Sequence, residues 1–122
     1  MLVPNLLVLY VTDPAESSFY YERLLGVAPA ARFPTYVAFA FNNGLVLGLW
    51  SMQAPNFVSG GSGHRSELAL MVPNDAEVRR LYGEWQAAGV TIEQPLCEAV
   101  FGLTFVATDP DGHRIRVCTP DD

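Results

Sequence analysis

Two similar helix-start signals stand about half a chain apart, and each follows a short apolar segment of strand length. In the first, Asp13 is a typical N-cap, Pro14 suits the first helical position and Glu16 completes a capping box. In the second, Asn74 and Glu77 stand in the same relation. This spacing in a chain of 122 residues indicates a duplicated module.

Apolar periodicity and turn residues predict the same element order in both halves, which is a strand, a helix and three further strands. The expected strands are 5–11, 27–33, 35–41 and 45–51 in the first half, and 67–72, 91–97, 101–107 and 113–118 in the second. The expected hairpin turns are Asn42-Asn43-Gly44 and Asp109-Pro110-Asp111-Gly112, and the helices end at Gly26 and Gly89. We therefore expect an α+β fold of two βαβββ modules in one domain spanning 1–122. Module one covers about 1–56, a Gly/Ser linker about 57–64 and module two about 65–122.

The composition narrows the classes of partner. Half of the residues are hydrophobic, only 16% are charged, and the net charge is −6 without a basic cluster, which argues against a nucleic-acid partner. So much apolar surface on a short chain favours an apolar ligand cleft or a buried homodimer interface. No targeting or membrane segment is evident, and Cys97 and Cys118 lack a metal-ligand or redox spacing, so we expect reduced thiols in the cytoplasm.

The duplicated order, closed by the Asp109-to-Gly112 turn and the strand after it, resembles the vicinal oxygen chelate superfamily of glyoxalases, bleomycin-resistance proteins and extradiol dioxygenases. Three stretches are similar to its phenazine-antibiotic resistance proteins: Tyr36-Val37-Ala38-Phe39 with Leu49-Trp50-Ser51, Ser66-Glu67, and Val100 through Phe105 continuing to Arg116-Val117-Cys118. The resemblance implies sheets that curl around a cleft and a homodimeric assembly.

The resemblance also implies four ligand places in metal-dependent members, and these fall here on Leu6, Gly48, Glu67 and Arg116. Leucine and glycine have no ligating side chain, and arginine is a permanent cation. We therefore expect neither a metal nor another cofactor.

Strand alternation from these four places predicts the cleft face. Tyr36 is expected opposite Trp50, with Gly48 leaving room beside them, while Glu67 and Arg116 are expected to lie on neighbouring strands. The predicted ligand-binding residues are Tyr36, Gly48, Trp50, Phe57, Glu67, Met71, Leu103, Phe105 and Arg116. Trp50 could equally be a core residue, and Glu67 with Arg116 a plain structural ion pair. His64 and His113 are expected to be solvent-exposed.

No nucleophile–base pair or phosphate loop stands out, so no catalytic residue is predicted. The leading hypothesis is a binding protein that sequesters a planar aromatic small molecule, similar to the phenazine-resistance branch. The alternative is a metal-free isomerase or lyase of the same fold with Glu67 as general base, and a regulatory or structural dimer is the third. An adjacent Arg116 would lower the pKa of Glu67, which counts against the enzyme.

Overall fold

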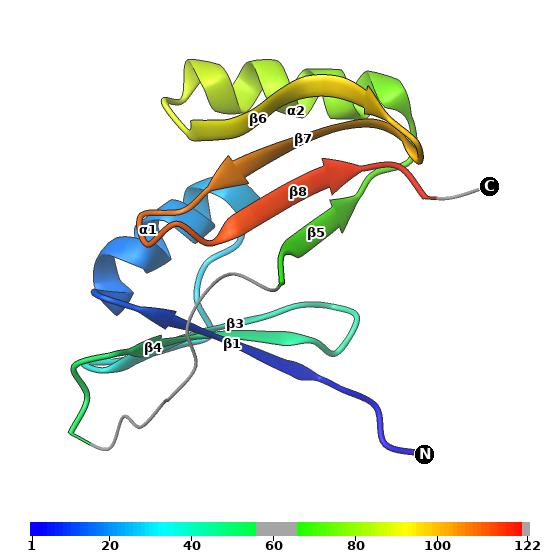
Figure 1. The fold of residues 1–122 in the computed structure, drawn as a ribbon. Helices are drawn as coiled ribbons and strands as arrows, with labels where there is room; N and C mark the ends of the chain where they lie inside the picture. The colour runs from blue at the N-terminus through cyan, green and yellow to red at the C-terminus, as the bar shows by residue number, and fades with distance from the viewer. Residues whose placement is uncertain (56–65, 121–122) are drawn as a thin grey trace. The chain divides into compact units, whose positions relative to one another are not determined.

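The computed structural model describes residues 1–55 and 66–120, and the chain divides into two compact units, 1–62 and 63–122. Each unit contains a strand, a helix and three further strands, and each has its own four-stranded sheet (Figure 1). The predicted α+β fold of two βαβββ modules is thereby confirmed. The predicted Gly/Ser linker, with Phe57 and His64, lies outside the described residues.

Unit 1 is built from β1 (Leu6–Val11), α1 (Pro14–Leu25), β2 (Ala31–Phe33), β3 (Tyr36–Ala40) and β4 (Val46–Ser51). Its sheet has the order β1-β4-β3-β2, in which β1 runs parallel to β4 and the other pairs are antiparallel. The strand predicted over 27–33 is shorter than expected. Pro29 has no N–H to donate, and pairing begins at Ala30, whose N–H donates to the Ala38 carbonyl at 2.8 Å.

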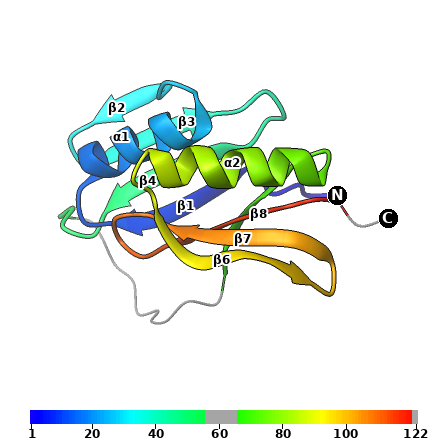
Figure 2. The ribbon, with the colours of Figure 1, turned by 90° about the horizontal axis from the view of Figure 1, so that it is seen from above.

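The capping signals form α1 as the sequence predicts. An Asp13 carboxylate oxygen accepts from the Ala15 N–H at 3.0 Å, and Gly26 ends the helix with a φ of 69°. α1 packs over β3 and β4 (Figure 2), where the fully buried Tyr21 meets Phe39 edge-on with ring centroids 6.5 Å apart. The core of unit 1 therefore lies between α1 and one face of the sheet.

Unit 2 repeats the order with β5 (Leu68–Met71), α2 (Asp75–Ala87), β6 (Thr91–Ala99), β7 (Gly102–Thr108) and β8 (Arg114–Cys118). Its sheet has the order β5-β8-β7-β6, again with one parallel pair, between β5 and β8. The cap of α2 is Asn74, whose side-chain oxygen accepts from the Glu77 N–H at 3.0 Å. α2 lies along one face of the sheet (Figure 1).

The hairpin between β7 and β8 differs by one residue from the register expected for a four-residue turn over Asp109-Pro110-Asp111-Gly112, which would place Leu103 and Phe105 on the face of Arg116. The Asp109 N–H donates to the His113 carbonyl at 3.0 Å, so these two residues close a three-residue loop. Phe105 consequently pairs with Val117, and Val106 pairs with Arg116. A one-residue slip moves every side chain of a strand to the other face. The prediction that Leu103 and Phe105 share the face of Arg116 is therefore wrong.

Both residues instead face α2. Phe105 is fully buried, with its ring 5.1 Å from that of Tyr82 and 5.4 Å from that of Trp85, and Leu103 lies on the same side of β7. These contacts make Phe105 the centre of the unit 2 core. No helix within the described part of the chain is long and apolar enough to cross a membrane.

Candidate functional site

The open face of the unit 1 sheet carries a row of aromatic side chains. Tyr36 pairs with Trp50 across β3 and β4, as the sequence predicts, because the Phe41 N–H donates to the Leu45 carbonyl and fixes the hairpin register. Phe33 pairs with Tyr36 in turn, and Tyr10 lies beside Trp50 on β1. Directly paired residues share a face, so four strands contribute rings to one surface.

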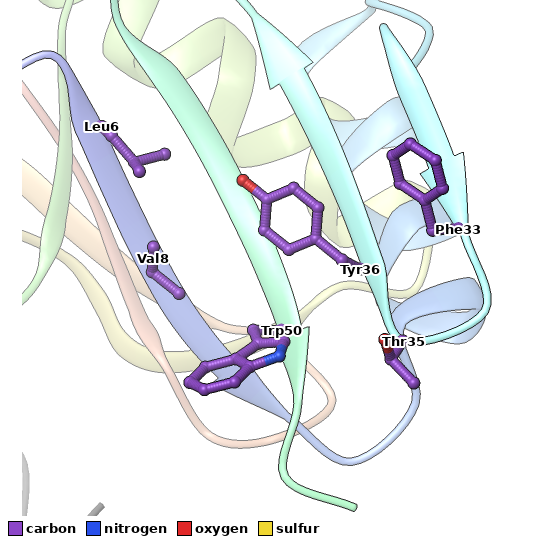
Figure 3. Close-up of a pocket in the computed structure, with 6 residues that line it drawn as sticks. All are labelled: Leu6, Val8, Phe33, Thr35, Tyr36 and Trp50. Atoms are coloured by element: carbon purple, nitrogen blue, oxygen red, sulfur yellow. The ribbon is translucent and has the colours of Figure 1, made fainter. Parts of the chain in front are cut away.

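A pocket of about 420 Å³ opens on this surface, which is within the range of about 300–1,000 Å³ typical of small-molecule sites. Its lining consists of three aromatic, two aliphatic and one hydroxyl side chain: Leu6, Val8, Phe33, Thr35, Tyr36 and Trp50 (Figure 3). None of the six is charged. The pocket can therefore hold an uncharged flat surface but offers no counter-ion.

Gly48 lies below this pocket rather than in its wall. A Cβ on Gly48 would come within 2.4 Å of the Tyr36 hydroxyl oxygen and 2.7 Å of a ring carbon, so the Tyr36 ring already occupies the space that the missing side chain leaves. The expectation that Gly48 leaves room for a ligand is therefore wrong. The missing side chain of Gly48 lets the Tyr36 ring come this close to β4. Figure 3 shows the ring of Tyr36 with its hydroxyl directed toward that strand.

Trp50 is half-buried, and one edge of its ring system is taken by Tyr10. The two ring centroids are 6.2 Å apart with an interplanar angle of 67°, an edge-on contact that limits how the indole can turn. The remaining surface of Trp50 lines the pocket. Trp50 is thus both a packed residue and a wall of the pocket.

Unit 2 carries the predicted pairing of Glu67 with Arg116. The Nε of Arg116 donates to one carboxylate oxygen of Glu67, and its Nη2 donates to the other at 3.3 Å. Arg114 approaches the same carboxylate at 3.5 Å. From below, the buried Thr104 hydroxyl accepts from Arg116 Nη1 at 3.2 Å and donates to the Val117 carbonyl at 2.7 Å. The guanidinium is therefore held on two sides.

This network sets the protonation of both partners. The hydrogen bonds from Arg116 hold the pKa of the Glu67 carboxyl below its ordinary value of 4.5, against the smaller opposing effect of burial. The same bonds raise the pKa of Arg116. Glu67 is consequently an ionised hydrogen-bond acceptor at neutral pH, which is a poor state for a general base.

A second pocket, of about 340 Å³, lies beside this pair. It is lined by Glu67, Met71, Phe101, Arg116, Cys118 and Thr119. Met71 is placed here as predicted, whereas Phe101, Cys118 and Thr119 were not among the predicted site residues. Phe101 belongs to the β6–β7 turn, and its ring lies 5.5 Å from the guanidinium carbon of Arg116. Cys97 and Cys118 lie on β6 and β8, the strands that flank β7, and neither forms a disulfide.

Sequence reasoning also missed Phe33 and Thr35 in the first pocket. Phe33 stands just before Pro34, in a strand of three residues whose pairing with β3 was not predicted. Phe33 could have been found from the sequence by pairing it with Tyr36 across the turn at Pro34 and Thr35, since directly paired residues share a face. Leu6 and Val8, by contrast, lie on the face that alternation predicts.

The four places of the implied metal site do not fit a divalent cation. Three of them carry Leu6, Gly48 and Arg116, and the fourth is the Glu67 carboxylate, which already accepts two hydrogen bonds from Arg116. Residues 1–55 and 66–120 contain no group of three or more His, Cys, Asp or Glu side chains that could hold a metal.

Comparison with known proteins agrees with this architecture. The chain is 32% identical to phenazine antibiotic resistance protein EhpR of Enterobacter agglomerans, over 98% of this chain and 94% of that protein. A protein of Agrobacterium tumefaciens, whose structure was solved in solution by NMR, is 40% identical over the full length of both chains, with a TM-score of 0.87. The crystal structure of a glyoxalase-related enzyme from Fulvimarina pelagi is 28% identical, over 98% of this chain and 90% of the other, with a TM-score of 0.81. The family model of the glyoxalase/bleomycin resistance protein/dioxygenase superfamily matches residues 4–117, and the chain belongs to this superfamily.

Proposed function

We propose that the protein binds a planar aromatic small molecule of the phenazine type and sequesters it without changing it chemically. The observation that carries this proposal is the uncharged pocket of unit 1, which presents Phe33, Tyr36 and Trp50 on one face of a sheet. The resemblance to a phenazine antibiotic resistance protein over nearly the whole chain supports the choice of ligand.

The physical basis of binding is burial of flat apolar surface. Removing apolar area from water contributes roughly 25 cal/mol per Å², and stacked or edge-on aromatic pairs add about 0.5–1.5 kcal/mol. The ring of Tyr36 is held flat above Gly48, so little rotamer freedom is lost when a ligand packs on it. Binding rather than catalysis is favoured because the pKa of Glu67 is lowered by Arg116, whereas a general base near neutral pH needs a raised pKa.

Titration of unsubstituted phenazine tests the proposal, with tryptophan fluorescence and calorimetry as readouts. Trp85 is buried between α2 and β7, so quenching by the ligand should come from Trp50 and disappear in Trp50→Phe. Phe33→Ala should weaken binding by roughly fivefold to a hundredfold, because it removes about 1–3 kcal/mol of contact.

The matched control is Phe19→Ala. Phe19 lies on α1 and is 65% exposed, close to the 61% of Phe33, but it does not line the pocket. Phe19→Ala should bind phenazine as the wild type does. If the wild type does not bind phenazine, or if Phe33→Ala and Phe19→Ala lose affinity equally, the pocket of unit 1 is not the site.

We further propose that the protein acts as a homodimer in the cytoplasm. Exposed apolar side chains such as Leu2, Val3 and Val100 could be covered by a second copy of the chain. Neither Cys97 nor Cys118 forms a disulfide, which suits a reducing compartment.

A further inference from the structure

The pocket of unit 2 differs in chemistry from that of unit 1. Two of its walls are apolar and accessible, since Phe101 is 43% exposed and Met71 is 68% exposed. Beside them stands the guanidinium of Arg116, whose side chain is only 16% exposed. A cation at the side of an apolar slot is the arrangement that recognises a flat molecule with an anionic substituent.

Arg116 has hydrogen-bonding capacity to spare. A guanidinium carries five N–H donors, and within the described residues Arg116 uses three of them, two on Glu67 and one on Thr104. One N–H on each terminal nitrogen remains. Because Thr104 and Glu67 hold the group on two sides, these two N–H groups are fixed before any ligand arrives, which reduces the entropy lost on binding.

The charged groups around the pocket balance one another. The single carboxylate of Glu67 lies between two guanidinium groups, those of Arg116 and Arg114. Glu93, the other acidic partner of Arg114, contacts that side chain at 3.2 Å, is 46% exposed and does not line the pocket. The wall of the pocket therefore carries one carboxylate and one guanidinium, with the guanidinium of Arg114 within 3.5 Å of that carboxylate, so no acidic excess opposes an anion in a chain whose net charge is −6.

We propose that the unit 2 pocket binds a planar aromatic carboxylate. Its ring packs on Phe101 and Met71, and its carboxylate accepts hydrogen bonds from the two remaining N–H groups of Arg116. Binding is non-covalent, and Glu67 and Thr104 act as positioning residues for the guanidinium. All residues of this site belong to unit 2, and the proposal does not rest on phenazine binding in unit 1.

A pair of isosteric probes, 2-naphthoate and the uncharged 2-naphthamide, tests the proposal by amide chemical shifts of the full chain at constant ionic strength. 2-Naphthoate should produce saturable shifts at Phe101, Gly102 and Thr119, and should bind at least tenfold more tightly than 2-naphthamide. Failure of the phenazine proposal would be seen separately, as absent shifts at Thr35, Tyr36 and Trp50 when phenazine is added.

Variants separate ring contact from carboxylate contact. Met71→Ala should weaken 2-naphthoate binding at least threefold, whereas the control Met52→Ala, an exposed methionine of unit 1 outside both pockets, should not. Arg116→Lys keeps the positive charge but loses the planar array of N–H donors of the guanidinium. It should therefore remove most of the preference for the carboxylate over the amide. If Arg116→Lys does not fold, the nearly isosteric Thr104→Val takes its place in the test. It should also reduce the preference for the carboxylate.

Two results would overturn the proposal. The first is equal affinity of the wild type for the acid and the amide, which would make Arg116 a structural ion pair alone. The second is 2-naphthoate binding whose shifts are confined to unit 1.

Discussion

The ring of Tyr36 lies on the backbone of Gly48, so closely that a Cβ at position 48 would stand 2.4 Å from the tyrosine oxygen. The contact is with a side chain that can turn, so an added methyl group would move the ring rather than the sheet. The flat floor of the unit 1 pocket thus depends on a residue that no ligand touches.

Gly48→Ala should therefore weaken phenazine binding while leaving the fold intact. We expect a loss of about 1–2 kcal/mol of binding free energy, similar to that of Tyr36→Ala, since both changes remove the same surface. Calorimetry of the two single variants and the double variant measures their coupling.

The double variant should bind no worse than Tyr36→Ala alone. Full additivity of the two losses would mean that Gly48 acts through something other than the Tyr36 ring.

The ion pair of Arg116 with Glu67 should be coupled in stability. Its side chains are 16% and 29% exposed, so we expect a coupling free energy of about 1–2 kcal/mol, between the values for exposed and buried pairs. Urea unfolding of Arg116→Ala, Glu67→Ala and the double variant gives this number.

The pair of Arg80 with Glu77 on α2 is the internal control. Arg80 is 54% exposed, so solvent screening should make the coupling in the same cycle there much smaller. Equal coupling in the two cycles would contradict the partial burial of the Arg116 pair.

Acid should remove the contribution of Glu67. Because Arg116 holds the folded pKa of Glu67 below its unfolded value of 4.5, the ionised carboxylate stabilises the fold above that pH. This contribution is lost as the pH falls through the folded pKa. The difference in unfolding free energy between wild type and Glu67→Gln should therefore be larger at pH 7 than at pH 3. A difference that stays constant over this range would show that the ion pair adds no stability.

Much of the fold could be predicted because its signals are local. The caps at Asp13 and Asn74 satisfy the first N–H groups of each helix, and the turn at Asn42-Asn43-Gly44 sets the pairing of Tyr36 with Trp50. Each of these features depends on residues within a few positions of one another. The pairing of Glu67 with Arg116 was predicted from the resemblance, which places the two residues on neighbouring strands, and β5 does pair with β8.

The rest depends on geometry that no local pattern determines. The segment from Asp109 to Gly112 can close a hairpin with either three or four residues in the loop, and that one-residue choice decided the face of Phe105. Similarly, the space left by Gly48 could hold a ligand or a neighbouring ring, and only the orientation of the Tyr36 side chain decides between them.

The oligomeric state can be measured directly. If the exposed apolar side chains of this chain are covered by a second copy, light scattering at micromolar concentration should give about twice the 13.4 kDa mass of one chain. Serial dilution should then reveal the monomer. The mass of a single chain at every concentration would contradict the homodimer.

Replacing Phe105 should destabilise the fold far more than replacing Phe101. Phe105 is fully buried against Tyr82 and Trp85, so Phe105→Ala should cost about 3–5 kcal/mol of unfolding free energy, and Phe105→Leu serves if the alanine variant does not fold. Phe101 is 43% exposed, so Phe101→Ala should cost under about 1 kcal/mol.

The fluorescence of Trp85 should shift in the Phe105 variants and stay unchanged in Phe101→Ala, because only Phe105 packs on that indole. Phenazine affinity of folded Phe105→Leu should equal that of the wild type. If Phe101→Ala proved the more destabilising change, Phe105 would face away from α2, and the register of β7 with β8 would be the one that the sequence alone predicts.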